Sequence, residues 1–150
     1  MISCTEFIPA YSEGFKFLEN IGGRAEVENF WAELSRLFLS NSLDKLVAEQ
    51  GLKGCYVYWS HSLNEEAADF TMILDEEKGE FSIEMFHCPS KGMLLDLNYI
   101  APYQSYCDHC TALYKPVVEK YGYGYHEEID ADHAKCQIII KKKNKCQTNK

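Results

Sequence analysis

The sequence predicts an α+β domain, in which an antiparallel sheet of about four to five strands packs against N-terminal helices and one long cysteine-bearing helix. Apolar residues recur at three- and four-residue spacing through the first fifty residues, which is typical of amphipathic helices. Two later regions alternate apolar and polar residues, as half-buried hairpins do. One long amphipathic segment lies between them, so the order of elements favours a sheet covered on one face by helices.

The N-terminal part is predicted to be helical. A short helix near residues 12–20 precedes Gly22-Gly23, which interrupts the apolar pattern. The stripe of the next helix comprises Val27, Phe30, Trp31, Leu34, Leu37 and Phe38. The phase shifts at the sequence SNS, so Ser42 is expected to be the N-cap of a further helix that ends at Gly51.

The middle of the chain is predicted to be β-structure. Residues 54–59, GCYVYW, are aromatic and β-branched and favour a strand, with a helix as the alternative. Residues 68–75 and 80–88 are expected to pair as a hairpin across EEKG. The alternating apolar positions of the second strand are Phe81, Ile83 and Met85. The segment CPSKG is expected to end this hairpin.

A long helix is predicted over residues 103–121, where apolar residues form an unbroken stripe. Pro116 is expected to kink this helix and Gly122 to end it. Strands at 124–130 and 134–143 complete the fold, and their shared inner positions include Cys136, Ile138 and Ile140.

The predicted organisation is one domain, residues 1–140, followed by a basic tail, residues 141–150. The net charge is −8, and the tail carries five lysines without an acid, so the body is more acidic than the whole chain. Nucleic acid is therefore not an expected partner, because phosphate contacts dominate that affinity. The tail is interpreted as a solvated end.

A cytoplasmic location is expected. The start, MISCTEF, has neither the basic nor the apolar region of a signal peptide, and no apolar run is long enough for a membrane helix. The chain has seven cysteines, an odd number, and no secretion signal. These features disfavour a disulfide framework and leave metal binding, thiol chemistry or burial as roles for the cysteines.

The motif YCDHC is the strongest candidate for chemistry. Cys107 and Cys110 lie three residues apart, so on a helix both sulfurs point to the apolar face, whereas His109 points to the flank and cannot easily join them. A metal site would need Cys88 and Cys136 as further ligands, with His87 as a substitute, and would suit zinc or iron. Burial is another interpretation, because free cysteines are ordinarily found in a core.

Catalysis by a thiolate is the second interpretation. Cys107 lies close to the predicted helix start, where the helix dipole favours ionisation. The nearby groups that could move a proton are Asp108, His109, His87, Asp130, Asp132 and Glu127. Tyrosines around the same helix, such as Tyr103 and Tyr106, suit either a small-molecule pocket between helix and sheet or a thick core.

The C-terminal part, from FHCPSKG through YCDHCTALYKPVVEKYGY to AKCQIII, resembles the L-2-amino-thiazoline-4-carboxylic acid hydrolase-like family of small bacterial proteins. The resemblance covers residues 86–140. It rests on a Cys-Pro after a strand, a cysteine-bearing helix that ends in glycine, an acidic stretch and a late cysteine in the last strand. The matching positions are Cys88, Cys107, Cys110 and Cys136, with Asp130 or Asp132 in the acidic stretch.

The resemblance implies ring-opening hydrolysis of a C–N bond in a cyclic, cysteine-derived thiazoline. Cys107 would attack the ring carbon, and His109 or Asp130 would protonate the leaving nitrogen. The expected substrate-binding residues are Tyr106, Tyr103 and a cation for the carboxylate, either Lys91 or Arg24.

Two other functions are expected as alternatives. The first is a non-enzymatic domain that senses a small molecule or a metal through Cys88, Cys107, Cys110 and Cys136. The second is an accessory protein whose acidic body docks a basic partner. The expected partners are a small-molecule ligand and a second copy of the chain in a homodimer, without a membrane.

Overall fold

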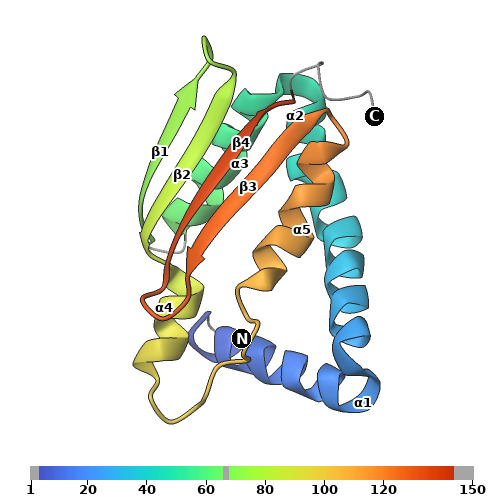
Figure 1. Ribbon diagram of the computed structural model, residues 1–150, viewed down its shortest axis with the longest axis vertical. Coiled ribbons are helices and arrows are strands. Elements are labelled where there is room, and N and C mark those ends of the chain that lie inside the picture. The colour runs from blue at the N-terminus through green and yellow to red at the C-terminus, as the bar shows by residue number, and fades with distance from the viewer. Residues whose placement is uncertain (1–3, 66–67, 144–150) are drawn as a thin grey trace, which may run out of the picture.

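The computed structural model describes residues 4–65 and 68–143, and it confirms the α+β prediction (Figure 1). The four strands of this part of the chain form one antiparallel sheet in the order β1-β2-β4-β3, and the helices gather on one side of it. No helix in the described residues is long and apolar enough to cross a membrane. The elements are α1 (Cys4–Phe38), η1 (Leu39–Asn41), α2 (Leu43–Gln50), α3 (Leu52–Glu65), β1 (Asp69–Asp75), β2 (Glu80–His87), α4 (Pro89–Asp96), α5 (Asp108–Glu119), β3 (Tyr123–Asp130) and β4 (Lys135–Lys142).

Helix α1 consists of two limbs that meet at a bend, as the predicted interruption at Gly22-Gly23 requires. Gly23 has φ 72° and ψ −173°, which lies outside the helical range. Glycine adopts a positive φ without steric cost because it lacks a Cβ atom. We call residues 4–22 the first limb and residues 24–38 the second limb; Figure 1 shows them running in very different directions.

The predicted strand at 54–59 is wrong, because these residues lie inside α3. The buried hydrophobic side chains of α3 are Leu52, Cys55, Trp59 and Leu63. Their three- and four-residue spacing is that of one helical face, and this face packs on the sheet. A Cβ atom at Gly54 would lie 2.1 Å from the backbone oxygen of Leu46, so glycine lets α3 cross α2 closely.

The predicted boundaries of α2 are confirmed in position, but the predicted cap is not formed. Ser42 directly precedes α2, yet its hydroxyl donates to the Phe38 carbonyl at 2.9 Å and caps no α2 amide. Gly51 ends the helix with φ 61°, and its N–H donates to the Val47 carbonyl. The start of α2 is therefore fixed by the turn that precedes it.

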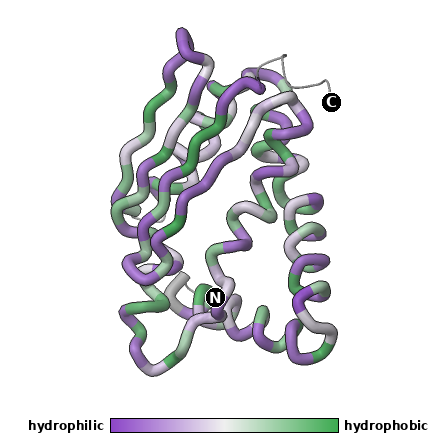
Figure 2. The backbone as a smooth tube through the Cα atoms, viewed as in Figure 1, coloured by the Kyte–Doolittle hydropathy of each residue, from purple (hydrophilic) through white to green (hydrophobic). Residues whose placement is uncertain are grey.

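Both predicted hairpins are confirmed. β1 pairs with β2, and β3 with β4, while β2 and β4 join the two hairpins at the centre of the sheet. Apolar and polar positions alternate along the strands (Figure 2). β4 continues through Lys142, so the first two residues of the predicted basic tail belong to the sheet, and residues 144–150 lie outside the described part.

Two buried clusters form the core. The first lies between the sheet and helices α2, α3 and α5. The second joins both limbs of α1 to α4 and to the segment before α5; its buried members are Phe15, Val27, Trp31, Leu94, Tyr103 and Tyr106. The second cluster therefore anchors the segment that leads to Cys107.

The elements around the cysteines differ from the prediction. CPSKG does not merely end the hairpin: Cys88 is the N-cap of α4, and Pro89 is its first residue. The helix predicted over 103–121 is shorter, because residues 104–107 form turns and α5 begins at Asp108. Cys107 is the N-cap of α5. The buried side chains of Tyr103 and Tyr106 hold these turns against α1.

Candidate functional site

Four cysteines and one glutamate gather where α4, the start of α5 and the sheet meet. Cys88 precedes α4, Cys107 and Cys110 lie at the start of α5, Cys136 lies on β4 and Glu127 on β3. They are close enough for their charges to act on one another. All four cysteines are free and partly buried. We call these five residues the thiol cluster.

Burial keeps three thiols of this cluster, those of Cys107, Cys110 and Cys136, protonated at neutral pH. It raises the pKa of Cys107 to about 11, although the positive charge of Lys91 acts in the opposite direction. Burial raises the pKa of Cys136 to about 12 and that of Cys110 well above its usual value. Of these three thiols, Cys107 is therefore the most easily ionised.

Lys91 is the only lysine of the described chain that is buried, with 8% of its surface exposed. Among the described residues, no carboxylate lies at ion-pair distance from its ammonium group. Its backbone N–H donates to the Cys88 sulfur at 3.4 Å, which fixes the start of α4. The ammonium nitrogen of Lys91 is not among the buried polar atoms that lack a partner in the described chain, so the stem of the side chain is buried while its charge stays accessible to an anionic ligand group.

Glu127 is the carboxyl group of the thiol cluster. It accepts hydrogen bonds from the hydroxyls of Thr111 and of Tyr125, the latter at 3.3 Å. Burial raises the pKa of Glu127, and the two hydrogen bonds act in the opposite direction. It therefore holds a proton more readily than an exposed glutamate. The sequence offered a signal for it, because Tyr125 and Glu127 share one face of a strand.

His109, which was predicted to lie on the flank of the helix and not to join both sulfurs, contacts one of them. Its Nε2 atom lies 3.6 Å from the Cys110 sulfur, and its Nδ1 atom is hydrogen-bonded to the Tyr106 carbonyl. A carbonyl accepts only, so this bond assigns the proton to Nδ1 and leaves Nε2 as an acceptor. Burial lowers the pKa of His109, so the ring is neutral at pH 7.

The two predicted substrate-binding tyrosines are both buried. Tyr106 borders the thiol cluster, and its hydroxyl lies 2.6 Å from the hydroxyl of Ser90. Tyr103 donates its hydroxyl to Glu19 at 2.8 Å and belongs to the second core cluster. Tyr106 therefore lines the site, whereas Tyr103 packs behind it.

Asp130 and Arg24 are engaged elsewhere. The Asp130 carboxylate is exposed at the end of β3 and accepts from His133 Nδ1 at 2.9 Å, which lowers the pKa of Asp130. Arg24 donates to Asp108 at 2.8 Å and to Glu28 at 2.9 Å. The structure thus brings Glu127, not Asp130, to the cysteines, and it leaves Lys91 rather than Arg24 without a carboxylate partner.

The predicted metal ligands do not form a coordination sphere. Across residues 4–65 and 68–143, no three or more histidine, cysteine, aspartate or glutamate side chains are arranged to hold a metal ion. Cys88, Cys107, Cys110 and Cys136 share one region, but not the close tetrahedral arrangement that zinc or iron would need.

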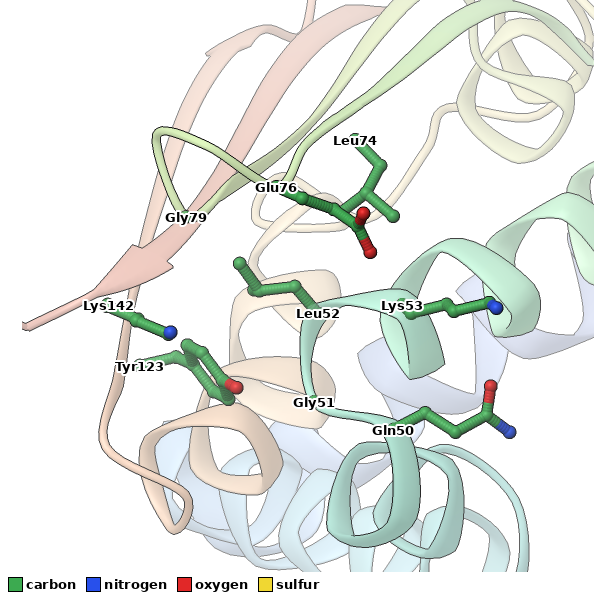
Figure 3. A pocket seen from close by; sticks show the side chains of 9 residues that line it. All are labelled: Gln50, Gly51, Leu52, Lys53, Leu74, Glu76, Gly79, Tyr123 and Lys142. Atoms are coloured by element: carbon green, nitrogen blue, oxygen red, sulfur yellow. The ribbon is translucent and has the colours of Figure 1, made fainter.

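A separate cavity of about 220 Å³ lies at the other end of the sheet, where β2 and β3 begin (Figure 3). Its lining residues are Gln50, Gly51, Leu52, Lys53, Leu74, Glu76, Gly79, Tyr123 and Lys142. None of them is a predicted site residue. The cavity and the thiol cluster are therefore different places in the fold.

No family model, no curated protein and no solved structure matches this chain.

Proposed function

We propose that this protein is a thiol-dependent hydrolase that breaks a C–N bond in a small, carboxylate-bearing ring of the thiazoline type. The observation that carries the proposal is Lys91, whose side-chain stem is buried, whose ammonium group has no carboxylate partner among the described residues and whose charge acts on Cys107. The substrate class comes from the resemblance of residues 86–140 to the thiazoline-carboxylate hydrolase-like family. We expect the protein to work in the reducing cytoplasm, where free thiols persist.

In this proposal Lys91 binds the substrate and Cys107 attacks it. The substrate carboxylate pairs with the Lys91 ammonium, which supplies the missing counter-charge. The Cys107 thiol gives its proton to the Glu127 carboxylate, and the sulfur bonds to the ring carbon between nitrogen and sulfur. Glu127 then donates that proton to the ring nitrogen, whose double bond to the carbon becomes a single bond. This single C–N bond breaks as the amino group on the same carbon becomes an imine and gives one proton to the leaving nitrogen.

Water completes the cycle. It attacks the carbon that is bonded to the Cys107 sulfur. Glu127 accepts one of its protons, and the other passes from the new hydroxyl group to the imine nitrogen as the carbonyl forms. The bond between that carbon and the Cys107 sulfur breaks, and the sulfur takes up the proton held by Glu127, which restores the thiol. The net change is the addition of one water molecule to the ring. Glu127 suits both steps because burial raises its pKa towards neutral pH.

The test is incubation of the purified, reduced protein with 2-amino-thiazoline-4-carboxylate, with mass spectrometry to detect the ring-opened product. Cys107→Ser, Glu127→Gln and Lys91→Met are each expected to lower kcat/KM by at least about 10²-fold. Lys91→Met should raise KM most, since it removes the carboxylate partner. Asp130→Asn is the matched control, because this exposed carboxylate bonds His133, and it should keep full activity.

Two results would contradict the proposal. One is a folded wild-type protein that does not convert the thiazoline carboxylate. The other is a Cys107→Ser variant that converts it at the wild-type rate. Circular dichroism of each variant separates loss of chemistry from loss of fold.

The second candidate function is ligand binding without turnover. The observation that favours it is the high pKa of Cys136 and Cys110, which keeps both thiols in their weakly nucleophilic form. Under this alternative the carboxylate still binds at Lys91, but the recovered ligand is intact. Equilibrium dialysis followed by mass spectrometry of the bound compound distinguishes the two functions.

A further inference from the structure

The first limb of α1 carries a second apolar face that does not contribute to the core. Its inner face packs Phe15 and its neighbours into the second core cluster. A different side carries Phe7, Ala10, Gly14, Phe17 and Ile21, which we call the outer stripe. Of the large residues in the stripe, Phe7 is 54% exposed, Phe17 64% and Ile21 63%.

The outer stripe is continuous along the helix. Its members follow one another at spacings of three and four residues, so they lie on one side of the limb, as the a and d positions of a heptad do. Exposed large apolar side chains are also concentrated on α1, which carries six of the thirteen in the described chain. The limb lies at the lower end of the molecule in Figure 1, away from the sheet.

We propose that the outer stripe is the contact surface of a homodimer, in which the first limbs of two copies pair antiparallel and cross at Gly14. In a two-fold pair centred on Gly14, Phe7 of one copy meets Ile21 of the other. Phe17 meets the region of Ala10, so a large side chain faces a small one. The stripe is therefore self-complementary, which is what an isologous contact requires.

Gly14 suits the crossing point. A Cβ atom built at Gly14 has no atom within 4 Å, so its surface is open within the described chain. With only a hydrogen atom there, two helix backbones can approach closely. Gly14 also lowers the stability of an isolated helix, and a close helix–helix contact would offset that cost.

The residues in and around the stripe disfavour two other occupants, the C-terminal segment of the chain and an anionic membrane. No member of the stripe is charged, and the neighbouring Glu13 is paired with Lys16 at 2.6 Å. The C-terminal segment KCQTNK is polar and does not match an apolar surface. The acidic residues of the limb, Glu6, Glu13 and Glu19, disfavour an anionic bilayer.

The surface area of the outer stripe determines how tightly the dimer is expected to form. An aromatic side chain buries about 150–250 Å² when it is fully covered, and a stable complex buries on the order of 800 Å² per partner. Two phenylalanines and one isoleucine supply only part of that area. The dimer is therefore expected to be reversible, with a Kd in the micromolar range. The net charge of −8 repels a second copy, so added salt should tighten the association.

Sedimentation equilibrium of the full chain tests this proposal. The wild type should show a monomer–dimer equilibrium that shifts towards dimer at high salt. Phe17→Gln and Gly14→Gln should each raise the dimer Kd by at least about tenfold, because the first removes an anchor and the second blocks close approach. Both positions are open in the monomer, so thermal melting of dilute protein should show an intact fold. Ile73→Ser, which changes an exposed residue of β1 (57% exposed), should leave the Kd unchanged.

Three results would overturn the proposal. The wild type could remain monomeric at the highest soluble concentration. Phe17→Gln and Gly14→Gln could form dimers as tightly as the wild type. The wild type could also partition onto phosphatidylcholine–phosphatidylglycerol vesicles while Phe17→Gln does not, which would assign the stripe to a membrane surface. None of these outcomes depends on the activity of the thiol cluster.

Discussion

Ser12 of α1 accepts a hydrogen bond from the backbone N–H of Tyr103 at 2.9 Å, across 91 residues of chain. Both residues are buried, and Ser12 is fully so. The bond ties the first limb of α1 to the segment that leads into α5. That segment carries Cys107, so the N-terminal helix determines where this thiol lies.

Ser12→Ala is therefore expected to destabilise the fold by about 1–3 kcal/mol, because the buried Tyr103 N–H loses its acceptor. Urea denaturation measures the change. Ser40→Ala is the control; this residue is exposed, and its change should stay within about 0.5 kcal/mol. Equal stability of Ser12→Ala and the wild type would show that the bond does not hold the segment.

The alkylation rate of Cys107 should keep rising with pH well beyond the range of an ordinary thiol. Burial raises the pKa of Cys107 to about 11, and the thiolate is the form that reacts with iodoacetamide. Peptide mass spectrometry of the folded, labelled protein gives the rate at each pH. Lys91→Met should slow labelling at pH values below the pKa of Cys107, since the ammonium charge favours the thiolate there. A rate that levels off near pH 9 would contradict the assignment.

Glu127→Gln should flatten part of the dependence of stability on pH. The pKa of Glu127 is higher in the folded state than the unfolded value of about 4.3, so the folded state binds more protons in the window between these two values. The free energy of unfolding therefore falls as the pH rises through this window. Glutamine keeps an acceptor for Thr111 and Tyr125 but does not ionise.

Denaturant titrations at a series of pH values from acidic to neutral measure the free energy of unfolding of both proteins. The wild type should lose stability across the window, whereas Glu127→Gln should not, and the variant should be at least as stable at pH 7. Glu84→Gln serves as the control, because Glu84 is exposed on β2. If Glu84→Gln changes the profile as much as Glu127→Gln does, the effect is not specific to the thiol cluster.

Gly54→Ala is expected to destabilise the fold by about 1–3 kcal/mol, because the new methyl group would overlap the Leu46 backbone oxygen and push α3 away from α2. Gly124→Ala is the matched control: its Cβ atom would have its nearest neighbour, the Lys141 backbone oxygen, at 3.8 Å. A thermal or urea melt of the two variants compares them directly. Equal stability of the two would indicate that α2 and α3 can separate without cost.

Local pattern predicted much of the fold. Period-two alternation identified both hairpins, including the inner position of Cys136, and glycine marked the bend of α1 and the end of α2. The prediction of a strand at residues 54–59 was wrong, because the preference of aromatic and β-branched residues for strands depends on their packing in a sheet. In α3 the buried residues, such as Cys55 and Trp59, follow a helical spacing.

The candidate site was predictable only in its parts. The sequence by itself determined that the four cysteines Cys88, Cys107, Cys110 and Cys136 lie in or beside predicted helices and strands. It also showed that acidic residues lie near them in the chain. Both features depend only on neighbouring residues in the sequence. Only the tertiary structure decided that Glu127 rather than Asp130 meets the thiols and that Lys91 is buried without a carboxylate partner. Burial and charge pairing depend on strands and helices that are distant in the chain, and local periodicity carries no information about those contacts.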